Sequence, residues 1–387
     1  MTKSKSVYLD YAAATPLDER VFAVMRPYLT ERFYNPAAIY QAAAMSRAAW
    51  NGALARLAAV IGAKESQLIL TAGATESINL AIWGVASRIP TAKVAVLATD
   101  HQAALRAAAR HPHTIIPVGP GGVASADTVA ARLDDDTALV SVDLINSELG
   151  TIQPVRQIAA AVGAVRKDRL ARGVSLPLWL HCDASQAAGL HDLHLSRLGV
   201  DLLSLNAGKC YGPKSTGLLW RRDGVELAPL IVGGGQQFGL RSGTQDVARA
   251  VGFAKALELA EEARPAETRR LAALRDRLQR RITDSLKGAI VNGDQKNRCA
   301  SFLHMSFIGA DGERLVYALD GSGVMAATGA ACSANRGNRS HVLEAIGLAA
   351  EAADGSLRFS LGRQNDQASI DFAADQVIKA VNRELGL

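Results

Sequence analysis

Short apolar runs alternate with helical stretches through the middle of the chain. Six runs predict strands, and several of them are apolar at nearly every position: residues 68–71, 94–99, 138–145, 177–183, 201–205 and 216–220. Strands that are apolar on both faces are typical of a mostly parallel sheet covered by helices. Longer segments such as 75–87 and 158–172 lie between them. The pattern therefore predicts an α/β fold built on a large, mostly parallel sheet sandwich.

The N-terminal part predicts an extended segment followed by helices. Residues 8–21 begin with an apolar stretch and small side chains, and Pro16 is placed near a helix N-terminus. A long amphipathic helix is predicted over 41–62, where apolar residues recur at helical spacing: Met45, Leu54, Leu57 and Ile61.

The pattern changes beyond about residue 250. One helix is predicted after Pro265, with its apolar positions at Leu271, Leu274, Leu278 and Ile282. Runs 300–307 and 357–361 predict strands, and 367–385 predicts a closing helix. We expect a large α/β domain over residues 16–250. A smaller α+β domain would comprise residues 1–15, with an N-terminal strand, plus 251–387.

Composition narrows the classes of function. Of the 387 residues 49% are apolar, enough for two packed cores. No run approaches the roughly 18 apolar residues of a membrane-spanning helix, and the basic N-terminus lacks the apolar segment of a secretion signal. The net charge of +6 is dispersed among acidic residues, which favours solvated helix faces over a nucleic-acid site. The four cysteines are widely spaced, so neither a disulfide framework nor a zinc site is expected and a cytoplasmic location fits.

The stretch 204–220 could carry chemistry. A short polar turn between two apolar strands presents Lys209, and Lys214 follows it. A lysine ammonium held between buried strands is costly unless it is paired or joined to a carbonyl as a Schiff base. The simpler explanation is a surface lysine whose charged end reaches water.

Two other strand ends carry candidate ligands. The segment TAGATES (71–77) follows a strand, and its small residues before a helix could admit a phosphate, with Thr75 adding a hydroxyl. Asp183 ends another apolar strand, where open α/β sheets bind ligands. A plain strand-to-helix turn and a helix-capping aspartate are the simpler alternatives.

Three further side chains complete the candidate set. His101 lies just past a strand, where a solvated or capping histidine is also common. Cys332 lies in a segment of small polar residues with little to bury it, which suits a reactive thiol. Arg358 begins an apolar run and suits carboxylate recognition. Together with Lys209, Asp183 and TAGATES, these residues match what pyridoxal 5′-phosphate requires: a helix N-terminus, an anion and a lysine.

With these residues in place, the sequence resembles the cysteine desulfurases of the housekeeping and nitrogen-fixation type, within the class V aminotransferase-fold enzymes. The resemblance runs nearly end to end, through motifs in the family's order: LDYAAATP, LTAGATESINLAI, NSELGTIQPV, HCDASQAAG, KCYGPKSTGLL, GGGQQFGLRSGT and LRFSLGR. It implies a fold of the aspartate aminotransferase type (fold type I of pyridoxal-phosphate enzymes), with the Cys332 loop in the smaller domain.

The resemblance also implies roles for individual residues. Lys209 would form the Schiff base, Asp183 would pair with the pyridine nitrogen, and Gln186 would bind the ring hydroxyl, near Ser147. His101 would stack on the ring and handle protons. The phosphate would be held by Ala74, Thr75 and Asn206, and by Thr244 of a neighbouring subunit, which implies a homodimer.

The implied reaction converts L-cysteine to L-alanine. Arg358, with Asn35, would bind the substrate carboxylate, Lys209 would move the Cα proton, and Cys332 would take the sulfur as a persulfide. The persulfide would pass to an acceptor: a sulfur-acceptor protein, a tRNA-modification component or an iron–sulfur scaffold. No membrane or direct nucleic-acid partner is expected.

Several positions depart from the family pattern. Asn206, Ala207 and Gly208 stand where the family has Ser-Gly-His before the lysine. Ser147 replaces the second asparagine of an Asn-Asn-Glu motif, and NPAAIY, ending at Tyr40, replaces an Asn-Pro-Ser segment. The chain also lacks the longer C-terminal tail with which housekeeping enzymes dock the iron–sulfur scaffold.

Two alternatives stay open. The chain could be another class V enzyme (a selenocysteine lyase, transaminase or epimerase), none of which needs Cys332. It could also be a degenerate homologue that acts as a binding partner in sulfur transfer.

Overall fold

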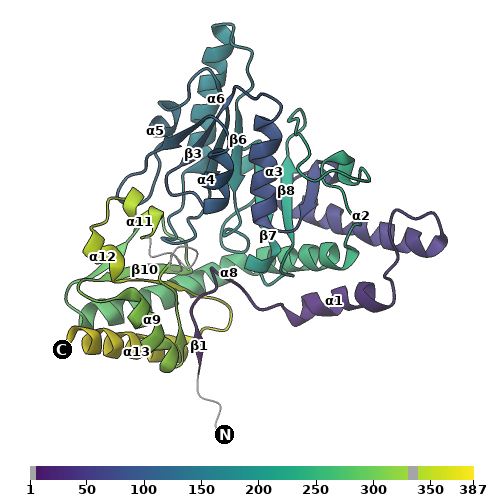
Figure 1. Cartoon of the computed structure of the whole chain (residues 1–387). Helices are drawn as coiled ribbons and strands as arrows, with labels where there is room; N and C mark the ends of the chain where they lie inside the picture. Colours follow the sequence, from purple (N-terminus) through teal and green to yellow (C-terminus); the bar gives the residue numbers. More distant parts are fainter. Residues whose placement is uncertain (1–5, 330–338) are drawn as a thin grey trace.

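The computed structural model describes residues 6–329 and 339–387 of the chain (Figure 1). Within these ranges the strands form a seven-stranded sheet, a three-stranded sheet and a two-stranded pair. Figure 1 shows the large sheet and its helices in the upper part of the molecule, with the C-terminal elements below it and to one side. A long helix, α8 (Val247–Ser285), passes beneath the large sheet.

Strand direction in the large sheet sets where its ends lie. The sheet order is β2 (Leu68–Thr71), β8 (Gly217–Arg221), β7 (Leu202–Asn206), β6 (Trp179–Asp183), β5 (Thr137–Asp143), β3 (Lys93–Leu97) and β4 (His113–Ile116). Of these seven described strands, six run in the same direction and only β8 runs in the opposite one. The expected large, mostly parallel sheet is confirmed. The sequence did not predict β4, because this edge strand exposes two of its four residues and lacks a continuous apolar run.

Helices cover both faces of this sheet. On one face pack α3 (Ala74–Ala86) and α4 (Gln102–Ala108). The other face carries α1 (Glu19–Thr30), α2 (Gln41–Ile61), α6 (Val155–Ala171) and the first part of α8, with the short helices α5 (Ala126–Ala130) and α7 (Leu195–Leu198). Successive residues of β5 face opposite helix layers: Leu139 packs with α3 and α4, and Val140 packs with the helices on the other face. This alternation explains why the central strands are apolar at nearly every position.

A second core lies around the three-stranded antiparallel sheet. In it β10 (Phe302–Phe307) pairs with β9 (Ala289–Asn292) and β12 (Ser356–Ser360). The helices α9 (Gly312–Gly321), α13 (Gln367–Leu385) and the second part of α8 contribute apolar side chains to this core. The first strand, β1 (Val7–Tyr8), pairs with β11 (Val324–Met325), and α11 (His341–Ala345) and α12 (Ala350–Asp354) complete the described elements.

Helix α8 corrects one sequence prediction. The expected helix start after Pro265 is wrong, because Pro265 lies inside a continuous helix of 39 residues. Phe253 packs in the core of the large sheet and Leu278 in the second core, so both halves of the helix are held by packing. Pro265 itself is exposed, and solvent can reach the carbonyl that its missing N–H leaves unpaired.

The expected boundary at residue 250 falls within α8, and the division into two domains stays a prediction. No helix in the described ranges is long and apolar enough to cross a membrane.

Gly150 packs tightly against Phe302 of β10, whose side chain belongs to the core of the large sheet. Its φ of 72° is a left-handed conformation, and a Cβ at this position would collide with Cβ of Phe302. We expect Gly150→Ala to lower the free energy of unfolding by about 2–4 kcal/mol, through backbone strain and overpacking. Chemical denaturation with a spectroscopic readout measures this loss. Gly163→Ala is the matched control, because Gly163 lies within α6 with no atom within 4 Å of the added Cβ. An equal loss in both variants would contradict the prediction.

Candidate active site

A cavity of about 350 Å³ lies at the edge of the large sheet where its parallel strands end. Five strands running in one direction each place at least one residue of this cavity at or just after their last position. These residues are Ala74 after β2, His101 after β3, Asp143 on β5, Asp183 on β6 and Lys209 after β7. Because the strands are parallel, chain segments far apart in sequence converge there.

Lys209 is presented by a tight turn at the end of β7. The backbone N–H of Gly208 donates to Oδ1 of Asn206 at 3.0 Å, which fixes a single 3₁₀ turn over Ala207–Lys209. The Lys209 ammonium donates to the carbonyl oxygens of Ala12 at 2.5 Å and Ala13 at 2.7 Å. The lysine is thus directed at the N-terminal segment and lines the cavity.

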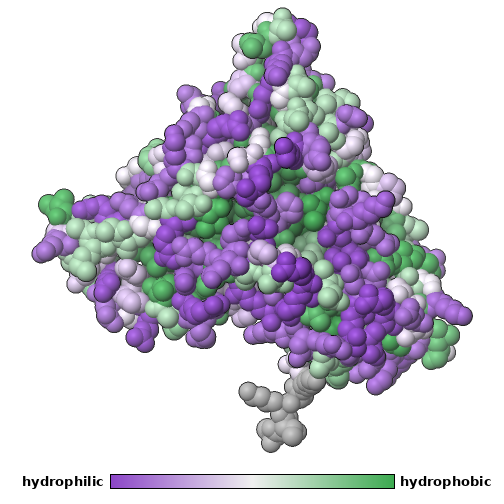
Figure 2. Space-filling view, turned by 180° about the vertical axis from the view of Figure 1, so that it is seen from behind, coloured by the Kyte–Doolittle hydropathy of each residue, from purple (hydrophilic) through white to green (hydrophobic). Residues whose placement is uncertain are grey.

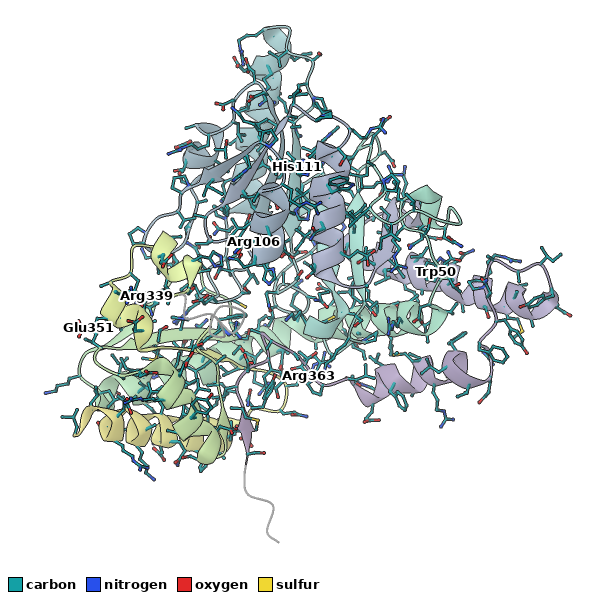
Figure 3. All side chains as sticks on the ribbon, viewed as in Figure 1. Trp50, Arg106, His111, Arg339, Glu351 and Arg363 are labelled. Atoms are coloured by element: carbon teal, nitrogen blue, oxygen red, sulfur yellow. The ribbon has the colours of Figure 1, made fainter. Side chains whose placement is uncertain are left out.

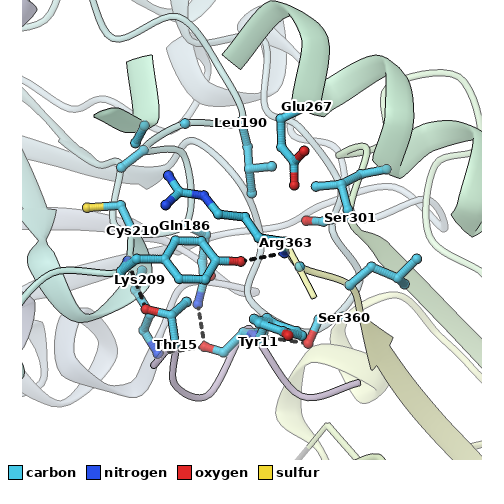
Figure 4. A pocket seen from close by; sticks show the side chains of 18 of the residues that line it. Tyr11, Thr15, Gln186, Leu190, Lys209, Cys210, Glu267, Ser301, Ser360 and Arg363 are labelled. Carbon is cyan, nitrogen blue, oxygen red and sulfur yellow. Dashed lines mark hydrogen bonds between the residues drawn. The ribbon is translucent and has the colours of Figure 1, made fainter. Parts of the chain in front are cut away.

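A second, smaller cavity adjoins Lys209 (Figure 4). In it Nε2 of Gln186 donates to the Ala12 carbonyl at 3.1 Å. Arg363, also labelled in Figure 3, stacks over the Tyr211 ring at 4.1 Å and pairs with Asp18 at 2.9 Å. These contacts hold the N-terminal segment against the lysine turn, so the carbonyls facing Lys209 have fixed positions.

The N-terminus of α3 faces the cavity. Gly73 precedes the helix with a φ of 134°, a conformation that favours glycine, and Ala74 and Thr75 follow at the cavity wall. A Cβ on Gly217 of β8 would collide with Gly73, so this turn and the neighbouring strand approach as closely as glycine allows. Unpaired backbone N–H groups and the helix dipole make this end a site for an anion such as a phosphate.

Three carboxyl groups gather at the same edge. Oδ1 of Asp183 accepts from the backbone N–H of Ser185 at 3.0 Å and from its hydroxyl. Asp143 is the register partner of Asp183 on β5, and Asp100 lies in the turn after β3. Burial, reinforced by Asp183, raises the pKa of Asp143 to about 7. Burial and the nearby Asp143 raise the pKa of Asp100 well above its usual range.

Two histidines line the cavity beside this cluster. His101 caps α4, and its Nδ1 accepts from the backbone N–H of Ala103 at 3.0 Å. A neutral His101 ring therefore carries its proton on Nε2. His341, at the start of α11, donates from Nε2 to the Asp100 carbonyl at 3.0 Å and accepts from the Gln102 amide at Nδ1. Burial lowers the pKa of His341, which favours its neutral form.

Arg358 enters the cavity from β12 of the smaller sheet. Its guanidinium donates to the Ser147 carbonyl at 2.8 Å and to Oδ1 of Asp10 at 2.7 Å, and only 6% of the residue is exposed. Glu148 is equally buried and accepts from the Ser340 hydroxyl at 2.8 Å. Burial raises the pKa of Glu148 to about 7, although the positive Arg358 opposes this shift.

The residues present fit a polar ligand that carries a phosphate, a cationic ring and a carbonyl. Four buried polar atoms of cavity residues have no hydrogen-bond partner within the described part of the chain: Thr99 Oγ1, Asp143 Oδ1, Glu148 Oε1 and Arg358 Nε. Leaving such atoms unpaired is costly, and a bound polar molecule offers them partners. The helix terminus, the Asp183 carboxylate and the Lys209 amine supply the anchors that pyridoxal 5′-phosphate needs.

The structure brings most of the sequence-predicted residues to this one cavity. Those that line it are Ala74, Thr75, His101, Ser147, Asp183, Gln186, Asn206, Lys209 and Arg358. Asn35 does not line it, because it lies in the loop between α1 and α2, where its side chain accepts from the backbone of Ala37. Thr244 lines a separate cavity with Gln237 and Arg241. Cys332 lies outside the described residues.

Sequence reasoning missed four titratable residues of the cavity: Asp100, Asp143, Glu148 and His341. Asp143 ends an apolar run just as Asp183 does, so the same signal could have found it. Asp100 directly precedes His101, and Glu148 lies within the motif NSELGT. His341 had no local signal, because it comes from α11 in the C-terminal part of the chain.

Comparisons with known proteins agree with this geometry. The family model for class V aminotransferases matches residues 7–372. The cysteine desulfurase IscS of Dictyoglomus turgidum is 36% identical over 386 residues, covering 98% of this chain and 95% of the relative. That of Methanosarcina thermophila is 36% identical over 389 residues, covering 99% and 93%.

Solved structures give the same result. A NifS-like protein superposes with a TM-score of 0.87 at 30% identity, covering 97% of this chain and 99% of the other. DndA from Streptomyces lividans superposes with a TM-score of 0.73 at 31% identity, covering 92% and 99%. These matches confirm the predicted resemblance and fold type. The chain therefore belongs to the class V aminotransferase family, in its cysteine desulfurase group.

Proposed function

We propose that this protein is a pyridoxal-phosphate-dependent cysteine desulfurase, which converts L-cysteine to L-alanine and takes the sulfur onto Cys332. One observation carries the proposal: the Lys209 amine, the Asp183 carboxylate and the N-terminus of α3 line the same cavity. An amine, an anion and a phosphate-binding helix end are the three groups that this cofactor needs.

Named residues of the cavity would hold the cofactor. The backbone of Ala74 and Thr75 would donate to the phosphate, and the Asn206 amide would donate as well, because its Oδ1 is already engaged with Gly208. Asp183 would pair with the pyridine nitrogen, and its Oδ1 is held in place by the backbone N–H and the hydroxyl of Ser185. When bound, the cofactor supplies an electron sink for negative charge that develops on the substrate Cα.

Gln186, Ser147 and His101 would bind around the ring. Gln186 and Ser147 lie on the cavity wall, with the Gln186 amide already anchored to the Ala12 carbonyl. His101 is fixed by its contact with the α4 backbone, so its ring can stack and its Nε2 can exchange a proton. These positions would orient the ring and exclude water from one of its faces.

Arg358 places a guanidinium on the wall of the cavity. Arg358 would bind the carboxylate of L-cysteine. Lys209 would then accept the Cα proton as a general base. The Cys332 thiolate would form a bond to the substrate sulfur while the carbon–sulfur bond breaks. The carbon left behind takes a proton to give L-alanine, and a sulfur-acceptor protein, a tRNA-modification component or an iron–sulfur scaffold would receive the persulfide.

A homodimer would complete the site through Thr244. Figure 1 shows α1 and the start of α2 forming an arm that extends away from the large sheet. Large apolar residues are exposed between and on these helices: Phe33 at 67%, Ile39 at 99% and Met45 at 57%. In the rear view of Figure 2, hydrophobic surface occurs at the tip of this arm among hydrophilic side chains. Exposed apolar clusters favour burial against another protein, here a second copy of the chain.

The cytoplasmic location stays a prediction.

Removing the proposed anchor tests the cofactor. Lys209→Ala should lose covalent attachment of pyridoxal 5′-phosphate and all turnover, because no other amine replaces the Lys209 ammonium in its turn. The visible absorption band after desalting, and mass spectrometry after borohydride reduction, measure the attachment. Lys214→Ala is the control, since Lys214 is exposed and does not line the cavity. Retention of the band in Lys209→Ala would refute the role of Lys209.

Replacing the proposed nucleophile tests the sulfur transfer. Cys332→Ala should abolish the protein persulfide and reduce sulfide release from L-cysteine at least about tenfold, because the attacking thiolate is gone. Persulfide-specific alkylation followed by mass spectrometry gives the readout. Cys210→Ser should keep the persulfide, because burial raises the pKa of the Cys210 thiol to about 12. A persulfide that survives in Cys332→Ala would contradict the assignment.

Replacing the guanidinium of Arg358 with an ammonium tests substrate binding. Arg358→Lys should raise the KM for L-cysteine about 10- to 100-fold, because lysine cannot contact the substrate carboxylate and the Ser147 carbonyl through separate planar N–H groups. Steady-state kinetics at saturating cofactor measure the change. Arg363→Lys is the control, because Arg363 does not line the large cavity, and it should leave KM within about threefold. Similar KM changes in both variants would count against Arg358 as the carboxylate ligand.

A further inference from the structure

Asp143 is a buried carboxyl group that the proposed reaction does not use. It is 4% exposed, lines the large cavity and stands beside Asp183 in register on the neighbouring parallel strand. Register partners on neighbouring strands direct their side chains to the same face of a sheet. The edge of the sheet therefore holds two carboxyl groups side by side where the ring of the cofactor would bind.

The two carboxyl groups differ in their hydrogen bonds. Oδ1 of Asp183 accepts two hydrogen bonds from Ser185, one from its backbone N–H and one from its hydroxyl. Asp143 receives one, from the Asn146 amide to Oδ2 at 3.1 Å, and its Oδ1 has no partner within the described ranges. Neighbouring buried carboxyl groups cannot both ionise without a large cost, and the one with fewer hydrogen-bond donors takes up a proton more readily. Of the two carboxyl groups, Asp143 is therefore the one that carries a proton.

Other titratable groups surround Asp143. Asp100 contacts it most directly, since the backbone N–H of Asp143 donates to Oδ1 of Asp100 at 2.9 Å. His101, His341 and Lys209 line the same cavity, as do Glu148 and Arg358. Burial and the charge of Asp183 raise the pKa of Asp143 to about 7, in agreement with the hydrogen-bond pattern.

We propose that Asp143 is a second carboxyl at the ring end of the site, protonated in the empty protein and deprotonated when a cationic pyridinium ring binds beside Asp183. The O–H bond of Asp143 breaks, the proton passes to the solvent buffer, and the new carboxylate offsets the positive charge of the ring. This inference rests on the proposed function, because it requires the cofactor ring in this cavity.

The raised pKa of Asp143 makes both the stability of the fold and the binding of the ligand depend on pH. The pKa of Asp143 in the folded empty protein lies above the usual value for aspartate, so Asp143 stabilises the fold less as pH rises through about 7. A cationic ring lowers that pKa again and restores the ionised form. Ligand binding below about pH 7 therefore releases a proton that binding well above it does not.

Pyridoxine 5′-phosphate is a suitable probe, because it has an alcohol in place of the aldehyde and binds without a bond to Lys209. Calorimetric titration of the cofactor-depleted full chain, in two buffers of different ionisation enthalpy, gives the number of protons released. At about pH 6.5, Asp143→Asn should release up to about one proton fewer than the unmodified chain. At about pH 8.5 the difference should vanish, because Asp143 is then already ionised.

Glu148→Gln is the matched control. Glu148 is also a buried carboxyl of this cavity with its pKa raised to about 7, but its neighbours are Ser340 and Arg358 rather than Asp183. On binding of pyridoxine 5′-phosphate, the Glu148→Gln variant should release as many protons as the unmodified chain. If Asp143→Asn fails to fold, as judged by its melting curve, Asp143→Ser makes the same comparison.

The outcomes distinguish a failure of the role proposed for Asp143 from a failure of the proposed function. Equal proton release by the unmodified chain and Asp143→Asn at about pH 6.5 would overturn the role of Asp143 while leaving the cofactor site intact. An equal loss in Glu148→Gln would also overturn it, since the effect would then be a general property of buried carboxyls. A failure of the unmodified chain to bind either the probe or pyridoxal 5′-phosphate would instead refute the proposed function.

Discussion

The shared direction of the strands in the large sheet is the constraint on which the candidate site depends. Because β2, β3, β5, β6 and β7 all end at one edge, the residues that follow them are brought together. A lysine, a helix N-terminus and an aspartate that are separated by up to about a third of the chain thereby share one cavity. An antiparallel arrangement would send alternate strand ends to opposite sides of the sheet.

This convergence also concentrates charge. Asp100, Asp143 and Asp183 meet where little water reaches them, and the structure offsets the cost with backbone donors. Asp100 accepts from the backbone N–H groups of Leu97 and Asp143, so the same contacts that satisfy its carboxyl also tie the turn after β3 to β5. Some of the buried polar atoms that have no hydrogen-bond partner within the described residues lie on the cavity wall, as expected of a surface that binds a polar ligand.

The second core supplies what the large sheet lacks. Arg358 comes from β12 and His341 from α11, and both reach the cavity from the C-terminal part of the chain. Helix α8 packs in both cores, and Phe302 of β10 extends from the smaller sheet into the core of the large sheet, where it contacts Gly150. The position of the guanidinium relative to Lys209 therefore depends on packing over a long helix rather than on any local motif.

The sequence by itself determined six of the seven described strands of the large sheet, the Lys209 turn, the Asp183 strand end and the family, because each depends on a short run of residues with a regular period or fixed order. It misplaced the start of α8, since the rule that proline ends a helix is local and packing at both ends overrode it. Only the tertiary structure decided that Asp143 stands beside Asp183 and that His341 faces Asp100. Strand register and the docking of α11 are long-range contacts, and the burial that sets the pKa of a carboxyl group exists only once those contacts have formed.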